Sequence, residues 1–459
     1  MRKNQFNQSP DDLFQQAIKF HQEGKLEKAE SLYLTLSKNI PNHPVILASL
    51  ATVLMQQNKS DLGISYAQKS LAINPQQIEL IFNLGVEYQK LAKLDQALEH
   101  YKKCDGYISN PLALYLNIGN TLKDLKRLDE AIHFYDKALA LKQDFNPALW
   151  NKALAKLTIG DFQEGWELYE SGWAVGERKP IKKYTATLWN GKDSLKGKRI
   201  YVHTEQGLGD SIQFSRYLLL LEKLGAEILF ETQAPLLRLF ETLDTHKTKL
   251  INEGNHIPPH DYAVALMSLP YLLKTNLENV PSTSPYLSAS AENKQYWKEK
   301  LGAKTKPRIG ITWSGSKTNS IDNNLCAKRH IPLSLWEPIL ALPFEFHGLQ
   351  KDLFPEDQSI LKRYKNLIPH HKELTDFAHT AGLLEEMDLV ISVCTSVAHL
   401  SAAMNHPTWI VIPYSSDFRR LQETDKSPWY SSIQLFRKED PLDWTSVIHR
   451  VANQLKNHF

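Results

Sequence analysis

The chain has 459 residues, a length that corresponds to about three domains at ~150 residues each. Apolar residues make up 42% of it and charged residues 23%, which is ordinary for a globular protein and excludes wholesale disorder. Lysine and arginine number 54 against 51 acidic residues, and the resulting net charge of +3 argues against nucleic acid or an anionic membrane as the main partner.

The cysteines and the apolar runs indicate the compartment. Cys104, Cys326 and Cys394 lie far apart without a CxxC pair, so neither a disulfide framework nor a cysteine zinc site is expected. The N-terminus, MRKNQFNQSPDDLF, lacks the apolar segment of a secretory signal. No apolar run approaches the ~18 residues of a transmembrane helix. We therefore expect a soluble, cytoplasmic protein without a membrane span.

The first third of the chain repeats with a period of 34 residues. Five units keep one register without a gap, and they begin at Pro10, Pro44, Ile78, Leu112 and Asn146. Small residues recur at the eighth position of each unit (Ala17, Ala51, Gly85, Gly119, Ala153) and at the twentieth (Ala29, Gly63, Ala97, Ala131, Gly165). The twenty-fourth position holds Tyr33, Ala67, Tyr101, Tyr135 and Tyr169.

This spacing predicts two antiparallel helices in each unit. Small residues let the two backbones approach closely, the large residue fills the gap to the next helix, and Pro41 and Pro75 end the second helix. The pattern resembles the tetratricopeptide repeat (TPR) over about residues 10–175. Lys152 and Lys156 occupy usually apolar columns of the fifth unit, as expected of a terminal repeat that packs against something else. The resemblance implies a groove for a protein or peptide; a scaffold that only spaces or dimerises is the alternative.

Beyond a connector at residues 176–197, strands and helices alternate. This order predicts two doubly wound α/β units, residues 198–290 and 306–459, with a ligand in the cleft at the carboxyl ends of their strands. The expected strands are residues 199–203, 227–231, 249–251, 262–266, 308–313, 344–347, 389–393 and 408–412. The expected helices are residues 210–224, 235–243, 293–301, 375–386, 396–404 and 444–455.

The turn after the first strand of the first domain is rich in glycine. Gln206, Gly207 and Gly209 precede Asp210 at the start of a helix. Glycines permit a tight turn and bring backbone N–H groups close to a ligand. The simpler alternative is that Asp210 only caps the helix.

Two turns in the second domain carry residues suited to phosphate. Ser314 and Lys317 follow its first strand and Arg329 lies beyond a polar loop; hydroxyls and cations suit phosphate oxygens, although an ordinary exposed loop is the alternative. In SVCTSVAH a strand ends, hydroxyls stand at the next helix N-terminus, and His399 lies in the first turn. Helix N-termini bind phosphate through free N–H groups and the helix dipole, whereas a lone histidine is more often a packed polar residue.

These motifs form a longer series, which runs EQGLGD, RIGITWSGS, RHIPL, GLQKD, DLVISVCTSVAHLSAA, FRRL, SPWY, LFRKED. Their order and spacing resemble the TPR-linked glycosyltransferase-like proteins of bacteria over about residues 198–456. The catalytic part is similar to the heptosyltransferase family and, more distantly, to O-linked N-acetylglucosamine transferase. The resemblance implies an α-helical TPR solenoid followed by an α/β GT-B fold, in which two Rossmann-like domains hold a nucleotide-sugar in the cleft between them.

The resemblance also implies roles for individual residues. Asp210 matches the acidic residue that heptosyltransferases are proposed to use as general base on the acceptor hydroxyl, with Gln206, Gly207 and Gly209 as the acceptor-side loop. Lys317 stands where such enzymes place a cation near the donor phosphates. The residues expected to bind the donor diphosphate are Ser314, Lys317, Arg329, Thr395, Ser396, Val397 and His399, of which the last four match the family's Asp-Thr-Gly-Leu-x-His phosphate loop.

Cys394 departs from this pattern, because the family has Asp there. A thiol cannot supply the acceptor geometry of a carboxylate to neighbouring N–H groups. The substitution Cys394→Asp is therefore expected to keep or raise nucleotide affinity. Ser396 and Val397 replace the family's Gly-Leu, which implies a less close approach to the phosphate.

No Asp-x-Asp motif stands near a donor-site strand, so the expected transfer needs neither a metal nor a cofactor, and the nucleotide-sugar is a substrate. The pairs His256/His260 and His370/His371 lie in proline-flanked loops. Exposure is the expected state for both pairs, rather than metal binding.

The main hypothesis is a glycosyltransferase that moves a sugar from a nucleotide-sugar to an acceptor, with a protein acceptor held by the TPR groove. The alternative is a non-catalytic TPR adaptor with a degenerate transferase domain, which Cys394 favours, while Asp210, Lys317 and His399 favour the enzyme. A third hypothesis gives the transferase a lipid or saccharide acceptor and the repeats a role in assembly.

Overall fold

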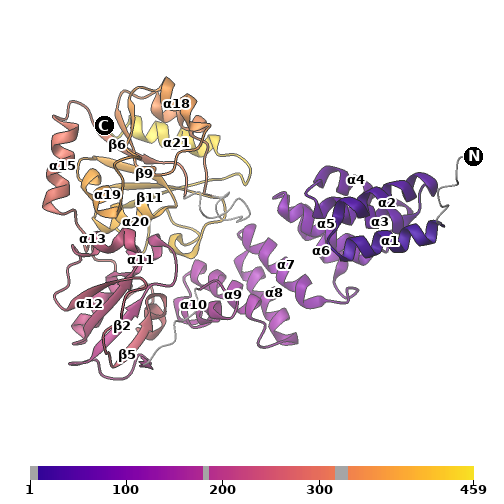
Figure 1. Ribbon diagram of the computed structural model, residues 1–459, viewed down its shortest axis with the longest axis horizontal. Helices are drawn as coiled ribbons and strands as arrows, with labels where there is room; N and C mark the ends of the chain where they lie inside the picture. The colour runs from indigo at the N-terminus through magenta and orange to yellow at the C-terminus, as the bar shows by residue number, and fades with distance from the viewer. Residues whose placement is uncertain (1–8, 179–185, 316–328) are drawn as a thin grey trace, which may run out of the picture. The chain divides into compact units, whose positions relative to one another are not determined.

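The computed structural model describes residues 9–178, 186–315 and 329–459 (Figure 1). Lys317 and Cys326 lie outside the described residues. The chain divides into two compact units, Met1–Ala148 and Leu149–Phe459. The described part of the first unit is built from helices, and the second contains two parallel β-sheets with their helices.

The first unit is a series of helix pairs, as the 34-residue period predicts. Proline occupies the first turn of three of its helices, where the missing N–H costs no hydrogen bond. Ser9 and Asp12 form a capping box at the start of the first helix. The contacting pairs are α1 (Pro10–Gln22) with α2 (Leu26–Asn39), α3 (Pro44–Gln56) with α4 (Ser60–Ile73), α5 (Ile78–Lys90) with α6 (Leu94–Cys104), and α7 (Pro111–Asp124) with α8 (Leu128–Leu141).

The small residues of the repeat lie where two helices of a pair meet. A Cβ atom added at Gly85 would lie 2.7 Å from the ring of Tyr101, and one added at Gly119 would meet the ring of Tyr135 in the same way. Both tyrosines are fully buried. Positions eight and twenty-four are therefore complementary, because the aromatic ring takes the space that a side chain would need.

The second unit contains two separate sheets in which all strand pairs are parallel. The first has the order β1-β5-β2-β3-β4 and the second β11-β10-β9-β6-β7-β8. The strands of the first sheet are β1 (Thr187–Leu188), β2 (Arg199–His203), β3 (Glu227–Thr232), β4 (Thr248–Asn252) and β5 (Tyr262–Ala265). Those of the second are β6 (Arg308–Thr312), β7 (Glu345–Gly348), β8 (Leu367–Pro369), β9 (Leu389–Val393), β10 (Thr408–Ile412) and β11 (Ile433–Arg437).

Helices connect these strands. Those before and around the first sheet are α9 (Asn146–Ile159), α10 (Phe162–Tyr169), α11 (Leu208–Phe214), α12 (Arg216–Lys223), α13 (Leu237–Phe240) and α14 (Leu269–Leu272). Those that follow are α15 (Ala291–Leu301), α17 (Glu337–Leu340), α18 (Asp357–Arg363), α19 (Phe377–Leu384), α20 (Ser396–Ala403) and α21 (Thr445–Lys456). Short 3₁₀ turns are η1 (Glu170–Trp173), η2 (Ala234–Leu236), η3 (Leu266–Ser268), η4 (Leu333–Trp336) and η5 (Phe418–Arg420).

The eight expected strands are confirmed to within about two residues, but two expected helices differ. The helix expected over residues 210–224 begins earlier and is divided at Ser215 into α11 and α12. The helix expected over 235–243 is reduced to η2 and the single turn of α13. Strands β1, β8 and β11 were not predicted, because edge strands of two to five residues carry little periodic signal.

Helix α10, the second helix of the fifth repeat, packs against aromatic residues of α11, which follows β2 of the first sheet, and of the segment that follows β10 of the second sheet. The ring centroid of Trp166 lies 5.9 Å from that of Phe214 in α11, and 5.3 Å and 6.4 Å from those of Phe418 and Trp429, which follow β10. Lys152 and Lys156 of α9 each form an ion pair with Glu164 of α10 at 2.7 Å, so both lysines find a partner within the fifth repeat itself. One continuous hydrophobic core includes these aromatic rings and residues under both sheets.

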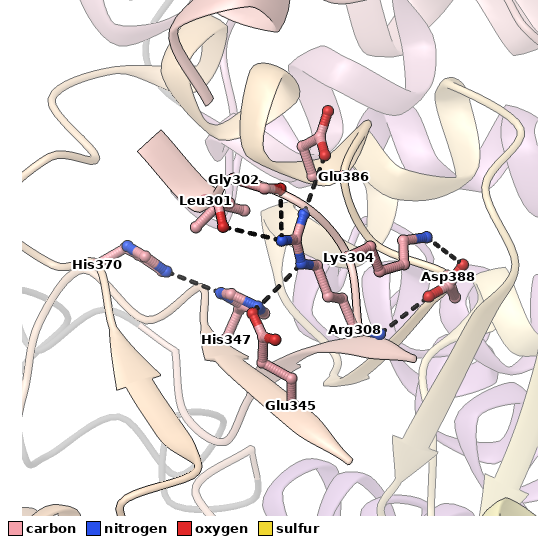
Figure 2. A network of polar contacts seen from close by, with 9 residues as sticks. All are labelled: Leu301, Gly302, Lys304, Arg308, Glu345, His347, His370, Glu386 and Asp388. Carbon is pink, nitrogen blue, oxygen red and sulfur yellow. Dashed lines mark hydrogen bonds and ion pairs between the residues drawn. The ribbon is translucent and has the colours of Figure 1, made fainter. Parts of the chain in front are cut away.

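A buried polar network joins the end of α15 to the base of the second sheet (Figure 2). Arg308, 1% exposed, donates to the carbonyls of Leu301 and Gly302 and forms ion pairs with Glu345 and Glu386. His347 bonds to Glu345 through Nε2 and to His370 through Nδ1, both at 2.9 Å.

The burial of His370 corrects one expectation. His370 is 2% exposed and stacks on the ring of His347, so the prediction that the His370/His371 loop is exposed is wrong for His370. His256 is exposed as expected, and His260 is half-buried. The local sequence could not show this, because Trp297 of α15, far away in the chain, covers the His370 ring.

Candidate anion-binding site between the two sheets

The carboxyl ends of three central strands of the second sheet lie side by side. Thr312 of β6 pairs in register with Ser392 of β9, and Val393 of β9 with Val411 of β10. The loops that leave these strands therefore start at the same edge of the sheet. They contain Ser314, Thr395 and the segment of η5.

Helix α20 begins at this edge with an N-terminus that no side chain caps. Thr395 occupies the N-cap position with extended backbone, but its hydroxyl bonds to the Ser392 hydroxyl at 3.0 Å instead of to the first turn of the helix. Ser396 is half-buried and Val397 is buried. The N–H groups of a first turn, together with the helix dipole, favour a negative charge there.

The start of α11, from the first sheet, packs on the start of α20 (Figure 1). A Cβ atom added at Gly209 would lie 3.1 Å from Cδ2 of His399 and 3.4 Å from Cα of Ser396. Gly207 is the exposed N-cap residue of α11. Glycine at position 209 thus permits the close approach of two helices that belong to different sheets.

Asp210 makes contacts with both sheets' elements. Its Oδ2 accepts the Gly207 N–H at 3.1 Å, so Asp210 does serve as the local cap that the simpler alternative describes. Its Oδ1 forms an ion pair with Nη2 of Arg419 in η5. In the carboxylate expected to be a general base, one oxygen therefore accepts a hydrogen bond at the start of its own helix. The other oxygen pairs with an arginine that follows β10 of the second sheet.

Arginines gather beside the start of α20 and have few acidic partners. Arg419 and Arg420 are 8% and 1% exposed, and Nε of Arg419 and both Nε and Nη1 of Arg420 are buried without a hydrogen-bond partner. Asp417 lies 3.5 Å from Arg419 and 3.5 Å from the half-exposed Arg329. Burial opposes the charge of Asp417, but Arg419, Arg329 and Arg420 together hold its pKa below the usual value.

The positive charge of these arginines affects the protonation of His399. Its pKa is lowered well below the usual value, first by burial and then by four arginines, Arg420, Arg419, Arg329 and Arg216. Its Nδ1 lies 3.4 Å from the hydroxyl of Tyr430. Because the ring is neutral, it can both donate and accept a hydrogen bond without adding to the positive charge.

Arg216 of α12 fixes the two sheets to each other. Its guanidinium lies between the rings of Tyr286 and Tyr430, at 4.6 Å and 4.3 Å from their centroids. It donates to the carbonyls of Pro281 at 2.5 Å and Trp429 at 2.6 Å, and its Nε is buried without a partner. This arginine is thus a fully buried cation held by carbonyl dipoles and aromatic faces.

The acceptor-side loop is held from the other side by the fifth repeat and by residues near the connector. Gln206 donates to the Tyr169 hydroxyl of α10 at 2.8 Å. Glu205, beside it, accepts from Arg178 at 2.9 Å and from the Met267 N–H at 3.0 Å. Burial raises the pKa of Glu205 to about 7 in spite of Arg178.

The structure therefore brings together part of the expected site. Gly209, Asp210, Ser396 and His399 lie in one junction, and Arg329 joins them through Asp417 and Arg419. Ser314 is buried at the same strand edge, where its N–H donates to Gln350 at 3.1 Å and its hydroxyl bonds to His330 at 3.0 Å.

Cys394 lies among the same charges. Burial raises the pKa of its thiol, while Arg420 opposes this. The cysteine is 9% exposed and lies between the end of β9 and Thr395, the N-cap residue of α20. Arg420, which has two unpartnered nitrogens, is therefore the cation that a carboxylate at position 394 would meet.

Sequence reasoning assigned no role to Asp417, Arg419 and Arg420. The motif FRRL belongs to the series of motifs that resembles the glycosyltransferase-like proteins, but that resemblance gave its two arginines no function. A signal was nevertheless present, because two consecutive arginines after an aspartate follow the carboxyl end of a predicted strand. In a parallel sheet that end is the usual place for ligand-binding residues.

Comparison with known proteins identifies the repeats. Residues 78–110 and 113–145 each match the tetratricopeptide repeat family. Protein FlbA of Caulobacter vibrioides is 26% identical over an alignment of 482 residues, which covers 91% of this chain and 79% of that protein. The chain therefore contains TPR repeats, and its similarity to FlbA extends through the region of the two sheets.

Solved structures of other TPR proteins are similar over part of the chain. The type IV pilus biogenesis factor PilW is 18% identical and covers 38% of this chain and 80% of its own, with a TM-score of 0.34. MamA is 19% identical and covers 35% of this chain and 94% of its own, with a TM-score of 0.33. YrrB, a TPR protein with an unusual peptide-binding site, is 15% identical and covers 37% of this chain and 87% of its own, with a TM-score of 0.34.

Two further observations concern the described residues. No helix within residues 9–178, 186–315 and 329–459 is both long and apolar enough to cross a bilayer. In the same part of the chain no group of three or more His, Cys, Asp or Glu side chains is placed to hold a metal ion.

Proposed function

We propose that the second unit binds a nucleoside diphosphate at the start of α20 and transfers a sugar from it to an acceptor. One observation carries this proposal: Arg419 and Arg420 are buried with unpartnered nitrogens at the uncapped N-terminus of a helix. Buried guanidinium nitrogens without a hydrogen-bond partner are costly, and a ligand with two or more negative charges would supply partners for them.

The charges near the site favour a multiply charged anion. Arg216, Arg329, Arg419 and Arg420 all act on His399, whereas the carboxylates in contact with them are Asp210 and Asp417. Four positive charges against two leave an excess of two among these described residues. A diphosphate supplies the matching charge, and its oxygens suit guanidinium and backbone N–H donors.

The transfer that we propose is a direct displacement in a GT-B arrangement. The acceptor oxygen forms a bond to the anomeric carbon, and its proton passes to Asp210. The bond from that carbon to the phosphate oxygen breaks, and its electron pair leaves with the diphosphate. Arg419, Arg420 and the first turn of α20 stabilise the negative charge of the leaving group. Lys317 is expected to add to this.

TPR repeats imply a protein-interaction role, and we propose that they select a protein acceptor. The alternative is an adaptor whose second unit binds nucleotide without turnover. The engagement of both Asp210 oxygens, by Gly207 and Arg419, favours this alternative. The two hypotheses share the diphosphate site and differ in turnover.

The first experiment is calorimetry of the full chain with pyrophosphate and with the diphosphates of adenosine, guanosine, uridine, cytidine and thymidine. We expect at least one nucleotide to bind, and Arg420→Gln to bind it about 10–100-fold more weakly, because a charge-assisted hydrogen bond contributes ~1.5–3 kcal/mol. Arg363→Gln is the matched control, since Arg363 is exposed and pairs with Glu337 elsewhere in the fold.

Binding of no nucleotide and no pyrophosphate would overturn the proposal. If a nucleotide binds, the corresponding sugar nucleotides are incubated with the full chain and with candidate acceptors. Release of the diphosphate together with a glycosylated product supports the transferase. Binding without turnover of any sugar nucleotide supports the adaptor.

A further inference from the structure

The ion pair between Asp210 and Arg419 unites two groups to which the proposed reaction gives opposite tasks. Asp210 belongs to α11, and Arg419 follows β10 in the second sheet's half. While they are paired, Oδ1 of Asp210 is occupied by a guanidinium, and its other oxygen accepts the Gly207 N–H. A carboxylate that takes a proton in this state gives up the Coulomb attraction of the guanidinium beside it, so proton transfer from an acceptor hydroxyl costs more than it would for an unpaired carboxylate.

Arg419 has the capacity for a second partner. Its Nη1 lies 3.5 Å from Asp417, and its Nε is buried with no partner. It is followed by Arg420, which has two buried nitrogens without a partner and acts on Cys394, the residue before the N-cap of α20. A diphosphate bound at that helix end would lie beside both guanidinium groups and would carry more negative charge than the single carboxylate of Asp210.

We propose that Arg419 is a positioning residue that exchanges Asp210 for the donor diphosphate. Before the donor binds, Arg419 holds Asp210 neutralised. When the diphosphate arrives, the guanidinium turns to the phosphate oxygens and Oδ1 of Asp210 becomes free to accept the proton of the acceptor. Donor binding thus makes the base available, and the donor must bind before the acceptor can react. This inference rests on the proposed function.

The exchange has a consequence that a purely structural ion pair does not have. Asp210 competes with the diphosphate for Arg419, so removing the carboxylate should tighten anion binding. The gain should require Arg419, because Arg419 is what the carboxylate withholds. A general electrostatic effect of removing one negative charge would instead persist without Arg419.

The experiment is a double-mutant cycle on the full chain, with inorganic pyrophosphate as the probe and calorimetry as the measurement. We expect Asp210→Asn to bind pyrophosphate about 3–10-fold more tightly than the parent, and Arg419→Gln about 10–100-fold more weakly. In the Arg419→Gln background, Asp210→Asn should change the affinity less than about twofold. Thermal melts of all four proteins establish that each is folded.

Asp376→Asn is the matched control. Asp376 is also an aspartate at a helix start, which caps α19 through the His379 N–H and pairs with Arg238 at 3.0 Å. This variant should bind pyrophosphate as the parent does. An Asp210→Asn protein with unchanged or weaker affinity overturns the exchange, and so does an equal gain in the presence and absence of Arg419. If the parent binds a nucleoside diphosphate but no pyrophosphate, that nucleotide replaces pyrophosphate as the probe; a parent that binds neither overturns the proposed function itself.

Discussion

Arg419 and Arg420 decide at the residue scale what this junction can accept. Both are buried, and both keep nitrogens without a protein partner beside the start of α20. A neutral, buried His399 adds a hydrogen-bonding group but no charge. The site is therefore suited to an anion, and acidic residues placed near these guanidinium groups act as competitors of that anion.

Cys394→Asp is a test of this competition. The family pattern predicts that the substitution keeps or raises nucleotide affinity, whereas the charges around position 394 lead us to expect the opposite. A carboxylate at position 394 would meet Arg420 and neutralise the cation that the anion needs. We expect pyrophosphate affinity to fall about tenfold or more, measured by calorimetry. Cys394→Ser, which adds no charge, serves as control; tighter binding by Cys394→Asp would contradict the role of Arg420.

Gly209→Val tests the contact between α11 and α20. Even a Cβ atom at position 209 would lie 3.1 Å from Cδ2 of His399, and the larger valine side chain would force the two helices apart. We expect the free energy of unfolding in urea to fall by about 1–3 kcal/mol, with weaker pyrophosphate binding. Gly315→Val should cost less stability, because a Cβ atom there meets no atom of the described residues within 4 Å. Equal costs would show that the helices are not tightly packed.

At the scale of secondary-structure elements, the Arg308 network of Figure 2 holds α15 and the second sheet together. Because the Glu345 carboxylate can only accept, His347 donates from Nε2 and its Nδ1 accepts from His370. Both rings are neutral in this arrangement. Burial lowers the pKa of His347 and of His370 to about 4 each.

This pair predicts a pH-dependent loss of stability. The unfolded chain binds protons on both histidines near pH 6.5, and the folded state does not until about pH 4. The contribution of the neutral pair to the free energy of unfolding is therefore complete above pH 6.5 and is lost as the pH falls from 6.5 to about 4. We expect His347→Gln/His370→Gln to flatten the decline of the free energy of unfolding between pH 7 and 5 by ~1–3 kcal/mol, in urea titrations at each pH. His256→Gln, at an exposed site, should leave the slope unchanged.

At the scale of the whole molecule, the fifth repeat belongs with the two sheets. The boundary between the two compact units falls after Ala148, before most of α9 and all of α10. Trp166 of α10 packs on Phe214 of α11, and both Trp166 and Tyr169 pack on Phe418, which follows β10. The Tyr169 hydroxyl also accepts a hydrogen bond from Gln206. The repeat period alone assigns this helix to the solenoid.

Truncation distinguishes the two assignments. We expect a chain that starts at residue 146 to unfold cooperatively in urea, because it keeps α9 and α10 whole. A chain that starts at residue 176 should not fold stably, because it loses Trp166 and Tyr169, and the loss of one large buried aromatic side chain costs about 3–5 kcal/mol. Equal stability of the two proteins would show that α10 does not belong to the second unit.

The repeats and most strands could be predicted because their signals are local. Tyr101 and Gly85 lie 16 positions apart within one repeat, and a buried strand such as residues 389–393 shows itself as a short apolar run. The glycine-rich turn and the start of α20 were predicted in the same way, from residues that follow strand ends.

The tertiary structure alone decided which of these residues meet and what charge surrounds them. Asp210 and Arg419 are 209 positions apart, and His370 is buried by Trp297 of a distant helix. Local spacing defines which element a residue occupies, whereas its partners and its burial depend on how elements that are remote in sequence pack against one another. For this reason the sequence predicted a phosphate site, and the packing placed an arginine on its expected base.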